Sequence, residues 1–486
     1  MNQRKQLIAF ACIAKRDVHF FLKAAERIRQ SRPDFEIVFI SFFQAGNSLV
    51  KELGFGCIDL YAYSKNFDFD LQEVSRFETS YHIENMQQML THERYTFNLS
   101  ESGPLLKKFM AYLAGLDAAF EPLRKKFGEE NIHVMQELGG FIAPLSLYFV
   151  ARRHRIEHIF FEPAYFRGRL FDVINSLDPI AISDTPVHEV TPECAAYIQQ
   201  TIQEKKIVIP SKDKHHFADM QLTKICNASN LSKLFFKLKY KYIDGNQQEY
   251  DHIWNHTRRY LTMYYNRKRN GSLYVRFDKD LKRAPYVYFP FHVQLDYSLT
   301  VRSLQYLNQL ALLEYVCAIL PAGVMLLAKE HPASIGGFSH PQLKSLLKRF
   351  DNFHLVHPSE NSYDIMADAM AVLTINSKVG AEALTAGKEV IAMGKSFYAN
   401  TAQVHYIHEL QNLGPVIQAI HGGYRKNNPT EVRRFFSGLW NYSYPTELYN
   451  MDDANIDHFA SHVCEHVMSG MGVEHDTDHQ PRCYAI

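Results

Sequence analysis

Residues 371–384 have the sequence Ala371-Val-Leu-Thr-Ile-Asn-Ser-Lys-Val-Gly-Ala-Glu-Ala-Leu384. An apolar run ends in Asn376, Ser377 and Lys378, and a helix-like segment begins immediately afterwards. A buried strand that passes directly into a helix is typical of a parallel sheet with helical crossovers. The first turn of such a helix has backbone N–H groups without a partner inside the helix, so it is a natural site for a phosphate.

The same alternation of strands and helices continues on both sides of this stretch. In the second half, we expect strands at 286–289, 324–328, 353–356, 372–375 and 390–392, separated by helices at 298–320, 340–350, 362–370 and 379–386. In the first half, we expect strands at 7–13, 36–41, 132–135 and 158–162, with helices at 17–30 and 143–153. The pattern predicts an α/β protein with two Rossmann-like, doubly wound domains.

The boundaries of these units follow from the same pattern. We expect an N-terminal domain at 1–230, a basic and aromatic helical insertion or linker at 231–284, and a C-terminal domain at 285–450, followed by a terminal helix at 451–470 and a flexible tail at 471–486. Ligands of such folds bind at the carboxyl ends of strands and between domains, so we expect the functional site there.

The composition excludes several classes of protein. Hydrophobic residues make up 46% and charged residues 22% of the 486 residues, as in ordinary globular proteins. Lys plus Arg (53) nearly balances Asp plus Glu (52), so the net charge does not favour nucleic acid. Seven dispersed cysteines without a CxxC pair argue against a zinc site and a disulfide framework, and suit a reducing cytoplasm.

The apolar run at 7–13 is too short for a secretion signal and is followed at once by charged residues, so we interpret it as a buried strand. No other stretch approaches the roughly 20 apolar residues that span a bilayer. We therefore expect a cytoplasmic protein that is soluble or lies peripherally at the inner face of the cytoplasmic membrane.

Basic and aromatic residues are concentrated at 233–283. The segment could be a helical subdomain with a solvated basic side, or a surface for anionic membrane lipid or an anionic glycolipid. Nucleic acid is the weakest alternative, because no nucleic-acid-binding motif accompanies these residues. They are Lys237, Lys239, Lys241, Arg258, Arg259, Arg267, Lys268 and Arg269, with Phe235, Phe236, Tyr240, Trp254, Tyr260, Tyr264 and Tyr265.

A second candidate segment follows the strand expected at 324–328. It contains Lys329, Glu330, His331 and Pro332, so an imidazole lies at the end of a strand. His331 could offer a phosphate an N–H group and, if the ring is protonated, a positive charge.

A third candidate segment follows the strand expected at 286–289. His292, Gln294 and Asp296 alternate along it, so their side chains could point to one side. The Asp296 carboxylate could act as a base or a nucleophile. Alternatively, Asp296 caps a helix that begins near Ser298.

Two residues around the helix start at 379 also have two interpretations. Ser377 could cap this helix, which is compatible with a phosphate bound to the same N–H groups. Glu382 could accept hydrogen bonds from ribose hydroxyls, or it could be a solvated helix residue.

The N-terminal half offers two more segments. Glu162 ends a strand and could transfer a proton to or from a hydroxyl, or it could form an ion pair with Arg167 or Arg169. Gly139 and Gly140 lie in a loop after another strand, where the absence of side chains would let a ligand approach the backbone.

The order of these segments resembles the capsule-synthesis family of bacterial Kdo transferases, Kdo being an eight-carbon acidic ulosonic sugar. The similarity extends from about residue 162 to 398. It is strongest in Asn361-Ser-Tyr-Asp-Ile-Met366, in 374–384, in Gly387-Lys-Glu-Val-Ile391 and in Gly394-Lys-Ser-Phe-Tyr398. The resemblance implies a GT-B fold, with CMP-β-Kdo as donor substrate in the C-terminal domain and the acceptor at the N-terminal domain. No further cofactor is expected. No metal is expected either, because the C-terminal unit offers no evident DxD pair after a strand.

The resemblance also implies the roles of individual residues. His331 and Ser377 would bind the CMP phosphate, Asp296 would form a covalent sugar adduct, and Glu162 would be the acid/base, so that the β configuration is retained. Together with the reasoning above, the expected donor contacts are His331, Pro332, Asn376, Ser377, Lys378, Glu382, Lys329 and His292, and the expected acceptor contacts are Gly139, Gly140 and Arg167.

The expected partners are the nucleotide-sugar donor and a glycan or glycolipid acceptor, from a capsule linker or a lipopolysaccharide O-antigen, without nucleic acid. Two other functions remain open. The donor could be CMP-sialic acid or a UDP- or GDP-sugar, or the chain could be a non-catalytic scaffold that binds membrane or assembly partners through 233–283.

Overall fold

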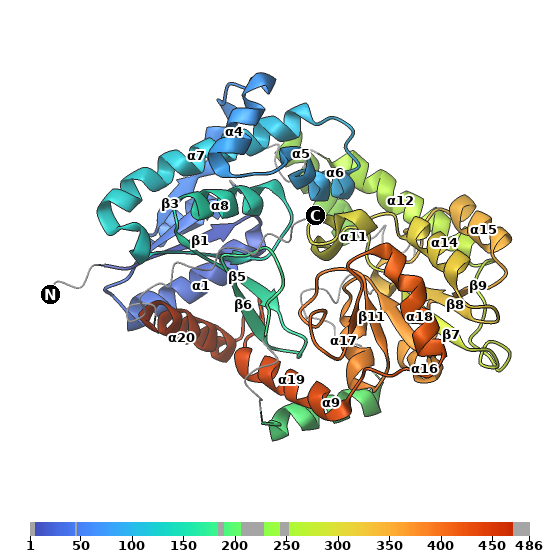
Figure 1. Cartoon of the computed structure of the whole chain (residues 1–486). Helices are drawn as coiled ribbons and strands as arrows, with labels where there is room; N and C mark the ends of the chain where they lie inside the picture. The colour runs from blue at the N-terminus through green and yellow to red at the C-terminus, as the bar shows by residue number, and fades with distance from the viewer. Residues whose placement is uncertain (1–4, 44–45, 183–188, 206–227, 244–251, 470–486) are drawn as a thin grey trace.

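The computed structural model of the chain describes residues 5–43, 46–182, 189–205, 228–243 and 252–469. These residues form two six-stranded sheets, one in each half of the chain, and helices cover both sheets (Figure 1). The predicted α/β fold with two doubly wound domains is confirmed. The tail expected at 471–486 lies outside the described residues.

The first sheet has the strand order β3-β2-β1-β4-β5-β6, which is the order of a Rossmann-like domain. All neighbouring strands are parallel except β6, which is antiparallel to β5. The strands are β1 (Leu7–Cys12), β2 (Glu36–Ser41), β3 (Gly56–Asp59), β4 (Ile132–Glu137), β5 (Glu157–Pro163) and β6 (Leu170–Ile174).

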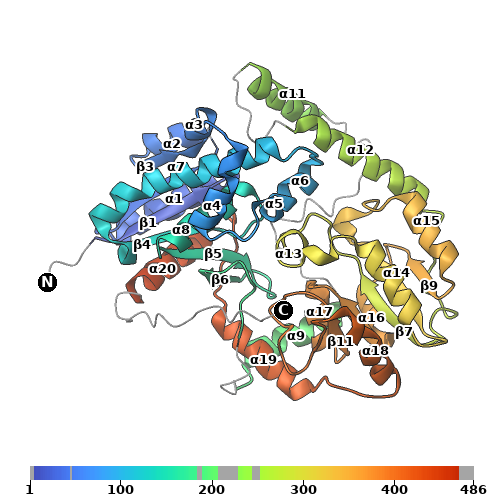
Figure 2. The same ribbon diagram turned by 45° about the horizontal axis from the view of Figure 1, so that its top comes forward.

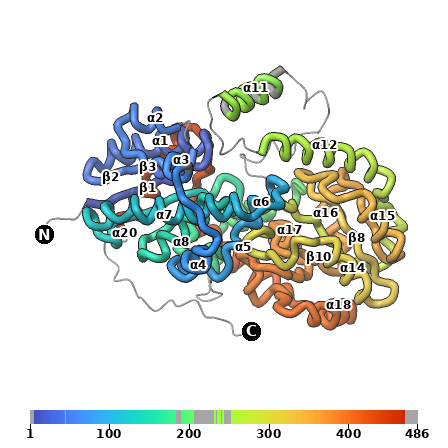
Figure 3. Tube along the Cα trace, turned by 90° about the horizontal axis from the view of Figure 1, so that it is seen from above, coloured from blue at the N-terminus to red at the C-terminus, as the bar shows by residue number. Residues whose placement is uncertain are grey.

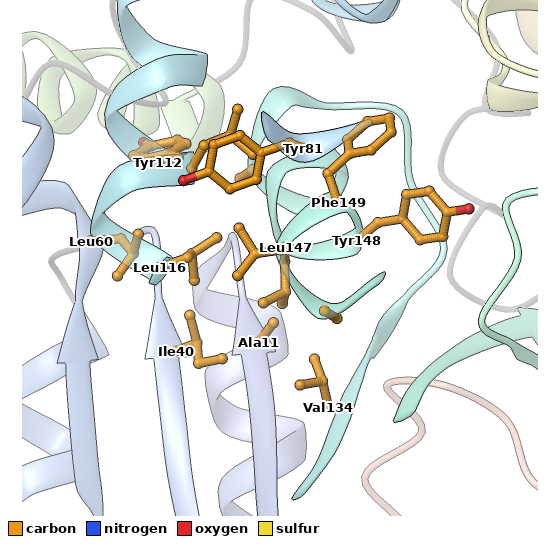
Figure 4. Close-up of a cluster of buried hydrophobic side chains, with 14 of the residues drawn as sticks. Ala11, Ile40, Leu60, Tyr81, Tyr112, Leu116, Val134, Leu147, Tyr148 and Phe149 are labelled. Atoms are coloured by element: carbon orange, nitrogen blue, oxygen red, sulfur yellow. The ribbon is translucent and has the colours of Figure 1, made fainter. Parts of the chain in front are cut away.

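Successive residues of β1 point to opposite faces of this sheet, and each face has its own core. On one face, α7 and α8 cover the strands; Figure 4 shows Ala11, Ile40 and Val134 of the sheet near Leu116 of α7 and Leu147 of α8. The helices of this domain are α1 (Lys15–Ser31), α2 (Asn47–Glu52), α3 (Leu60–Lys65), α4 (Val74–Tyr81), α5 (Met86–Met89), α6 (Thr91–Phe97), α7 (Gly103–Phe127) and α8 (Ile142–Arg153).

The second sheet has the order β12-β11-β10-β7-β8-β9, and all its strands are parallel. Counted from β7, this is the strand order of the first sheet. The strands are β7 (Tyr286–Pro290), β8 (Met325–Lys329), β9 (Phe353–Val356), β10 (Ala371–Thr374), β11 (Val390–Ala392) and β12 (His405–Tyr406), and the helices are α13 (Tyr297–Thr300), α14 (Gln309–Ile319), α15 (His340–Arg349), α16 (Ser362–Asp368), α17 (Lys378–Thr385) and α18 (Leu413–His421).

The prediction of a single helix at 298–320 is wrong. The chain forms α13, a 3-10 turn at Leu304–Tyr306 and then α14, which Asn308 caps by accepting the N–H of Ala311. Between the two helices, the chain turns so that Arg302 and Ser303 are buried. Their side chains bond to groups outside this segment, and those bonds favour the turn over a continuous helix.

After the second sheet, α19 (Pro429–Tyr442) packs against α17 and α9 (Pro192–Glu204) in the core of the second domain. The chain then returns to the first domain, where Tyr444 pairs with Leu170 at the start of β6. The last helix, α20 (Asp453–Ser469), packs against α1 and covers the second face of the first sheet.

Two helices precede the second sheet: α11 (Ala228–Tyr242) and α12 (Ile253–Asn270). α12 packs against α6 and α15, so it contacts both domains. Figures 2 and 3 show α11 and α12 at the outer edge of the molecule. No helix in the described part of the chain is long and apolar enough to cross a membrane.

Candidate functional site

The residues expected to bind the donor lie at the carboxyl ends of β7, β8 and β10. The strand order of the second sheet reverses between β7 and β10, and open α/β sheets bind their ligands outside such a reversal. His292 follows β7, His331 follows β8, and Asn376 and Ser377 follow β10. The structure thus brings these segments to one edge of the sheet, as predicted.

Asp296 lies among three histidines. Burial lowers the pKa of His92 and His331 to about 4 and that of His292 to about 3, and the nearby Asp296 carboxylate opposes each shift. All three rings are therefore neutral at pH 7. The positive charge that His331 could have offered a phosphate is absent at this pH, and the ring offers only an N–H group.

The His331 ring is held in one tautomer. Its Nδ1 accepts the backbone N–H of Ala333 at 3.2 Å, at the start of the 3-10 turn Pro332–Ser334. Because Nδ1 is an acceptor, the proton of the neutral ring lies on Nε2. Pro332 serves as the first residue of this turn, which fixes the position of the imidazole.

His292 connects the ends of two strands. Its Nε2 accepts the backbone N–H of Ile375 at 3.2 Å and is 3.2 Å from the hydroxyl of Thr374. Its backbone N–H and C=O both bond to the side chain of Gln309. The buried His292 ring thus braces β7 against β10; its contact with a donor stays a prediction.

Asp296 caps α13. Its Oδ1 accepts the N–H of Ser298 at 2.8 Å, so the capping alternative describes its contact in this structure. The residue is nevertheless exposed, while Leu299 and Thr300 beside it are buried. A fixed backbone with an exposed carboxylate is compatible with a nucleophile, and that role stays a prediction.

The start of α17 has the expected cap. Ser377 accepts the N–H of Val379 at 3.2 Å. The amide of Asn376 donates to the backbone oxygen of Ser298 (2.7 Å) and to the hydroxyl of Ser303 (3.0 Å), so it links β10 to the α13 segment. The Asn376 Oδ1 is buried and has no hydrogen-bond partner.

Lys329 and Glu382 are both buried. The interpretation of Glu382 as a solvated helix residue is therefore wrong. Lys329 donates to the backbone oxygen of Glu360 at 2.9 Å; burial lowers its pKa to about 8, although Glu360 and Glu382 oppose the shift. Glu382 also contributes to the raised pKa of Tyr288 and Tyr363, so it lies inside the domain among other polar groups.

Glu162 forms an ion pair with an arginine that the sequence did not indicate. Both its oxygens accept from Arg302, at 2.8 and 3.0 Å. The predicted alternative, an ion pair of Glu162 with Arg167 or Arg169, is wrong. Arg167 is exposed, and Arg169 donates to Ser443. Burial alone would lower the pKa of Arg302, but the ion pair raises it above the usual value.

Other polar contacts join the two domains beside this ion pair. Lys378 donates to the backbone oxygens of Pro163 (3.2 Å) and Ala164 (2.8 Å) at the end of β5. Tyr297 donates to the backbone oxygen of Leu177 at 2.8 Å. The segments that carry Glu162, Asp296 and Ser377 thus meet at the boundary between the domains.

The acceptor-side glycines have different surroundings. A Cβ atom on Gly140 would lie 2.7 Å from the ring of His92, whereas one on Gly139 would make an ordinary 3.6 Å contact with Pro144. The space beside Gly140 is therefore filled by His92, whose Nδ1 is hydrogen-bonded to Thr300 at 2.7 Å. An acceptor therefore cannot occupy the space beside the Cα atom of Gly140 unless His92 moves.

Sequence reasoning missed His92 and Arg302. His92 lies in 42–131, where the sequence predicted no elements, and Arg302 lay inside the helix expected at 298–320. Only the contacts of Thr300 and Glu162 reveal them. In the described ranges, no group of three or more His, Cys, Asp and Glu side chains is placed to hold a metal ion.

Comparisons with known proteins found a similar sequence and similar solved structures. Protein FixF of Sinorhizobium fredii is 32% identical over 165 residues; the match spans 32% of this chain and only 37% of FixF. Among solved structures, the chain is similar to the beta Kdo 2,7 transferase of Thermosulfurimonas dismutans KpsC, with 17% identity, 82% and 98% of the two chains covered and a TM-score of 0.33. A glycosyltransferase from Rickettsia africae has 9% identity, with 97% and 100% covered and a TM-score of 0.31.

The sequence profile of the family described as capsule polysaccharide biosynthesis protein matches residues 145–405, which is more than half of the chain and includes all segments of the C-terminal site. The chain therefore belongs to the capsule polysaccharide biosynthesis protein family, as its motifs predicted.

Proposed function

We propose that the chain is a glycosyltransferase that transfers Kdo from CMP-β-Kdo to a surface-polysaccharide acceptor with retention of configuration. The observation that carries the proposal is the position of Asp296. Its exposed carboxylate interacts electrostatically with His331 and follows β7, at the edge of the sheet where α17 begins. The proposed nucleophile and the two proposed phosphate-binding groups lie at one edge of the sheet.

In this proposal, the donor phosphate accepts the Nε2–H of His331 and the N–H groups in the first turn of α17. These donors are neutral, so the helix dipole supplies the positive potential. The buried Oδ1 of Asn376 has no hydrogen-bond partner in the protein, so it could accept a hydrogen bond from a hydroxyl of the donor. The ammonium group of Lys378 is bound by two backbone oxygens of the first domain, so in this proposal Lys378 orients the two domains. It would contact the donor only after these two hydrogen bonds break.

The reaction would proceed by two displacements. The Asp296 carboxylate attacks the anomeric carbon, the bond from this carbon to the phosphate oxygen breaks, and CMP leaves with the electron pair. The acceptor hydroxyl then attacks the same carbon, the ester to Asp296 breaks, and a base takes the hydroxyl proton. Two inversions at one carbon retain the configuration.

Glu162 is the proposed base of the second step. Both its oxygens are held by Arg302, so one of them must leave the guanidinium before it can accept a proton. Arg302 comes from the donor domain and Glu162 from the acceptor domain, so this exchange would accompany a small movement between the domains.

The first test is intact-mass measurement of the protein after incubation with CMP-Kdo. We expect an adduct with the mass of one Kdo residue on the wild type and none on Asp296→Ala, which should lose turnover and keep CMP binding. Asp280→Ala, which removes an exposed carboxylate before β7, is the matched control and should behave as wild type. Unchanged turnover in Asp296→Ala would remove this residue from the mechanism.

A panel of donors separates the alternatives. Hydrolysis or transfer with CMP-sialic acid or with a UDP- or GDP-sugar, but not with CMP-Kdo, would keep the enzyme class and change the donor. No donor-dependent product with any of them would favour a non-catalytic scaffold.

We place the acceptor, a glycan or glycolipid of a capsule linker or lipopolysaccharide O-antigen, at the first domain, and the protein at the inner face of the cytoplasmic membrane. The concentration of basic and aromatic residues in α11 and α12 supports this location.

A further inference from the structure

α12 is attached to the body of the protein by one face. Met263 is buried, the amide of Asn266 donates to the backbone oxygen of Gly336 at 3.2 Å, and that of Asn270 donates to the backbone oxygen of Phe338 at 3.1 Å. These contacts fix the rotation of the helix and so determine which residues face outward.

The outward residues of α12 form one stripe. Trp254, Arg258, Leu261, Tyr265 and Arg269 are separated by four, three, four and four residues, so they lie on one side of an α-helix with 3.6 residues per turn. All five are exposed; Trp254 exposes 57% of its surface, and Leu261 and Tyr265 each expose 58%. In a helix bound to a folded body, the outer face is normally polar.

α11 has a similar stripe. Leu231, Phe235, Leu238 and Tyr242 follow the same spacing; Phe235 exposes 72% and Tyr242 63% of its surface. The indole Nε1–H of Trp254 donates to the hydroxyl of Tyr242 at 3.2 Å, so the two stripes meet. We call the residues of both stripes, with Lys239 and Lys268 beside them, the α11–α12 surface.

This surface is both apolar and basic. Of the twenty large apolar or aromatic side chains that are exposed in the described residues, nine lie between 231 and 265. Neither helix contains an Asp or Glu residue, whereas Lys and Arg occur throughout both. Exposed aromatic residues beside basic ones match the boundary between the headgroups and acyl chains of an anionic bilayer.

A protein partner would fit this surface less well. A binding surface for a protein normally has an apolar core from which charged residues are depleted, a polar rim around it, and a shape that fits the partner. Here, the apolar side chains form two narrow rows, with basic groups interspersed and no acidic groups in either helix. A fluid lipid surface needs no shape complementarity and supplies negative charge everywhere.

We propose that the α11–α12 surface is the element that docks the protein on an anionic lipid membrane. The apolar and aromatic side chains of both stripes enter the headgroup region, and the neighbouring Lys and Arg side chains bind lipid phosphates. The proposal deepens the proposed membrane location and is independent of the donor and of the transfer reaction.

The test is cosedimentation of the full chain with lipid vesicles, without donor. We expect binding to vesicles of phosphatidylcholine and phosphatidylglycerol in about equal parts, at least about tenfold weaker binding to phosphatidylcholine alone, and loss of binding when salt shortens the screening length from about 10 to about 3 Å.

Two double variants test the two components of the surface, one for the apolar side chains and one for the basic side chains. Phe235→Ser/Leu261→Ser removes apolar side chains, and Arg258→Gln/Lys268→Gln removes charge; each should weaken binding at least about tenfold. Matched controls are Leu71→Ser, whose leucine exposes 62% of its surface in the 3-10 turn Leu71–Glu73, and Lys23→Gln/Lys51→Gln on the first domain. The controls should bind as wild type. CD spectra and thermal unfolding verify that each variant is folded.

The outcomes separate the two proposals. If wild type and variants bind anionic vesicles equally, the membrane location stands and the α11–α12 surface is not its basis. If wild type binds no vesicle, both the location and the docking role are overturned, while the transferase proposal is unaffected. If the variants instead abolish a self-association seen by light scattering, the surface is an interface between copies and the lipid proposal is overturned.

Discussion

Burial determines the charge of single histidines in this protein. His158 is the clearest example, because it lies in β5 at 1% exposure and neither ring nitrogen has a hydrogen-bond partner. Burial lowers its pKa to about 3, so the ring is neutral in the folded chain at neutral pH. In the unfolded chain, the same ring binds a proton below about pH 6.5.

This difference predicts acid destabilisation. As the pH falls below about 6.5, the unfolded chain gains protons that folded His158 does not, so the free energy of unfolding decreases until the pH reaches the folded pKa. One pH unit corresponds to about 1.4 kcal/mol, so the ring contributes on the order of 3 kcal/mol between about pH 6.5 and pH 4. Denaturant titrations measure the free energy of unfolding from pH 7 to pH 4. In His158→Leu, this free energy should decrease less steeply with falling pH than in wild type, whereas in His19→Leu, which replaces an exposed histidine, it should decrease as in wild type. An unchanged slope in His158→Leu would contradict the assignment.

The neutral state of His331 predicts how it acts on a phosphate. Loss of one hydrogen bond to a charged group costs about 1.5 to 3 kcal/mol, so His331→Ala should bind CMP at least about tenfold more weakly. Since burial lowers the His331 pKa to about 4, the ratio of wild-type to variant affinity should be the same at pH 6 and pH 8. Calorimetric titration with CMP measures both. A ratio that rises towards pH 6 would mean that the imidazolium is the binding form.

The sequence predicted which residues follow the strands, but not how they are paired. His292, His331, Asn376 and Ser377 were found because polar residues after a buried strand are a local pattern. Their bonds could not be predicted, because each depends on a turn or a strand elsewhere in the chain. The pairing of Glu162 with Arg302 is such a case, since 140 residues separate the two.

At the level of elements, strands were easier to predict than helices. Central parallel strands are short apolar runs, and the strands expected in the second half of the chain match β7 to β11 within one or two residues. α7, with 25 residues, was not predicted. It packs against α3, α4 and α8, so its apolar residues surround much of the helix and give no single periodic stripe.

The break between α13 and α14 positions Arg302 for its ion pair with Glu162, and we expect this ion pair to contribute to the free energy of unfolding. Arg302 is 9% exposed, and removal of one partner of a buried ion pair leaves an uncompensated charge. Glu162→Gln should therefore lower the free energy of unfolding by about 2 to 4 kcal/mol, and Glu162→Gln/Arg302→Met should recover part of the loss.

The exposed pair Asp280 and Arg283 provides the control, because disrupting an exposed ion pair costs about 1 kcal/mol or less. Chemical denaturation of wild type, Glu162→Gln, Glu162→Gln/Arg302→Met and Asp280→Asn gives the comparison. If Glu162→Gln is as stable as Asp280→Asn, the ion pair does not hold the domains together.

For the whole molecule, the decisive feature is the return of the chain to its first domain. Two sheets with the same strand order are joined by interdomain bonds near the candidate site, and also by the chain after α19, which pairs with β6 at Tyr444 and then packs against α1 as α20. The sequence predicted a terminal helix but not its place, because the apolar face of a helix does not indicate which domain it covers. The first domain therefore requires the end of the described chain to complete its core.

This dependence predicts that a change in α20 destabilises the first domain selectively. Phe459 is fully buried, and its ring contacts those of Phe20, Phe21 and Phe161. Replacement of a buried phenylalanine by alanine costs about 3 to 5 kcal/mol, so Phe459→Ala should increase hydrogen exchange in α1 and β1 while exchange in β7 and β10 changes little. Met468→Ala, at the exposed end of α20, should leave both domains as in wild type. Equal acceleration in both sheets would mean that the domains unfold as one unit, and unchanged exchange in β1 would mean that α20 adds little to the stability of the first domain.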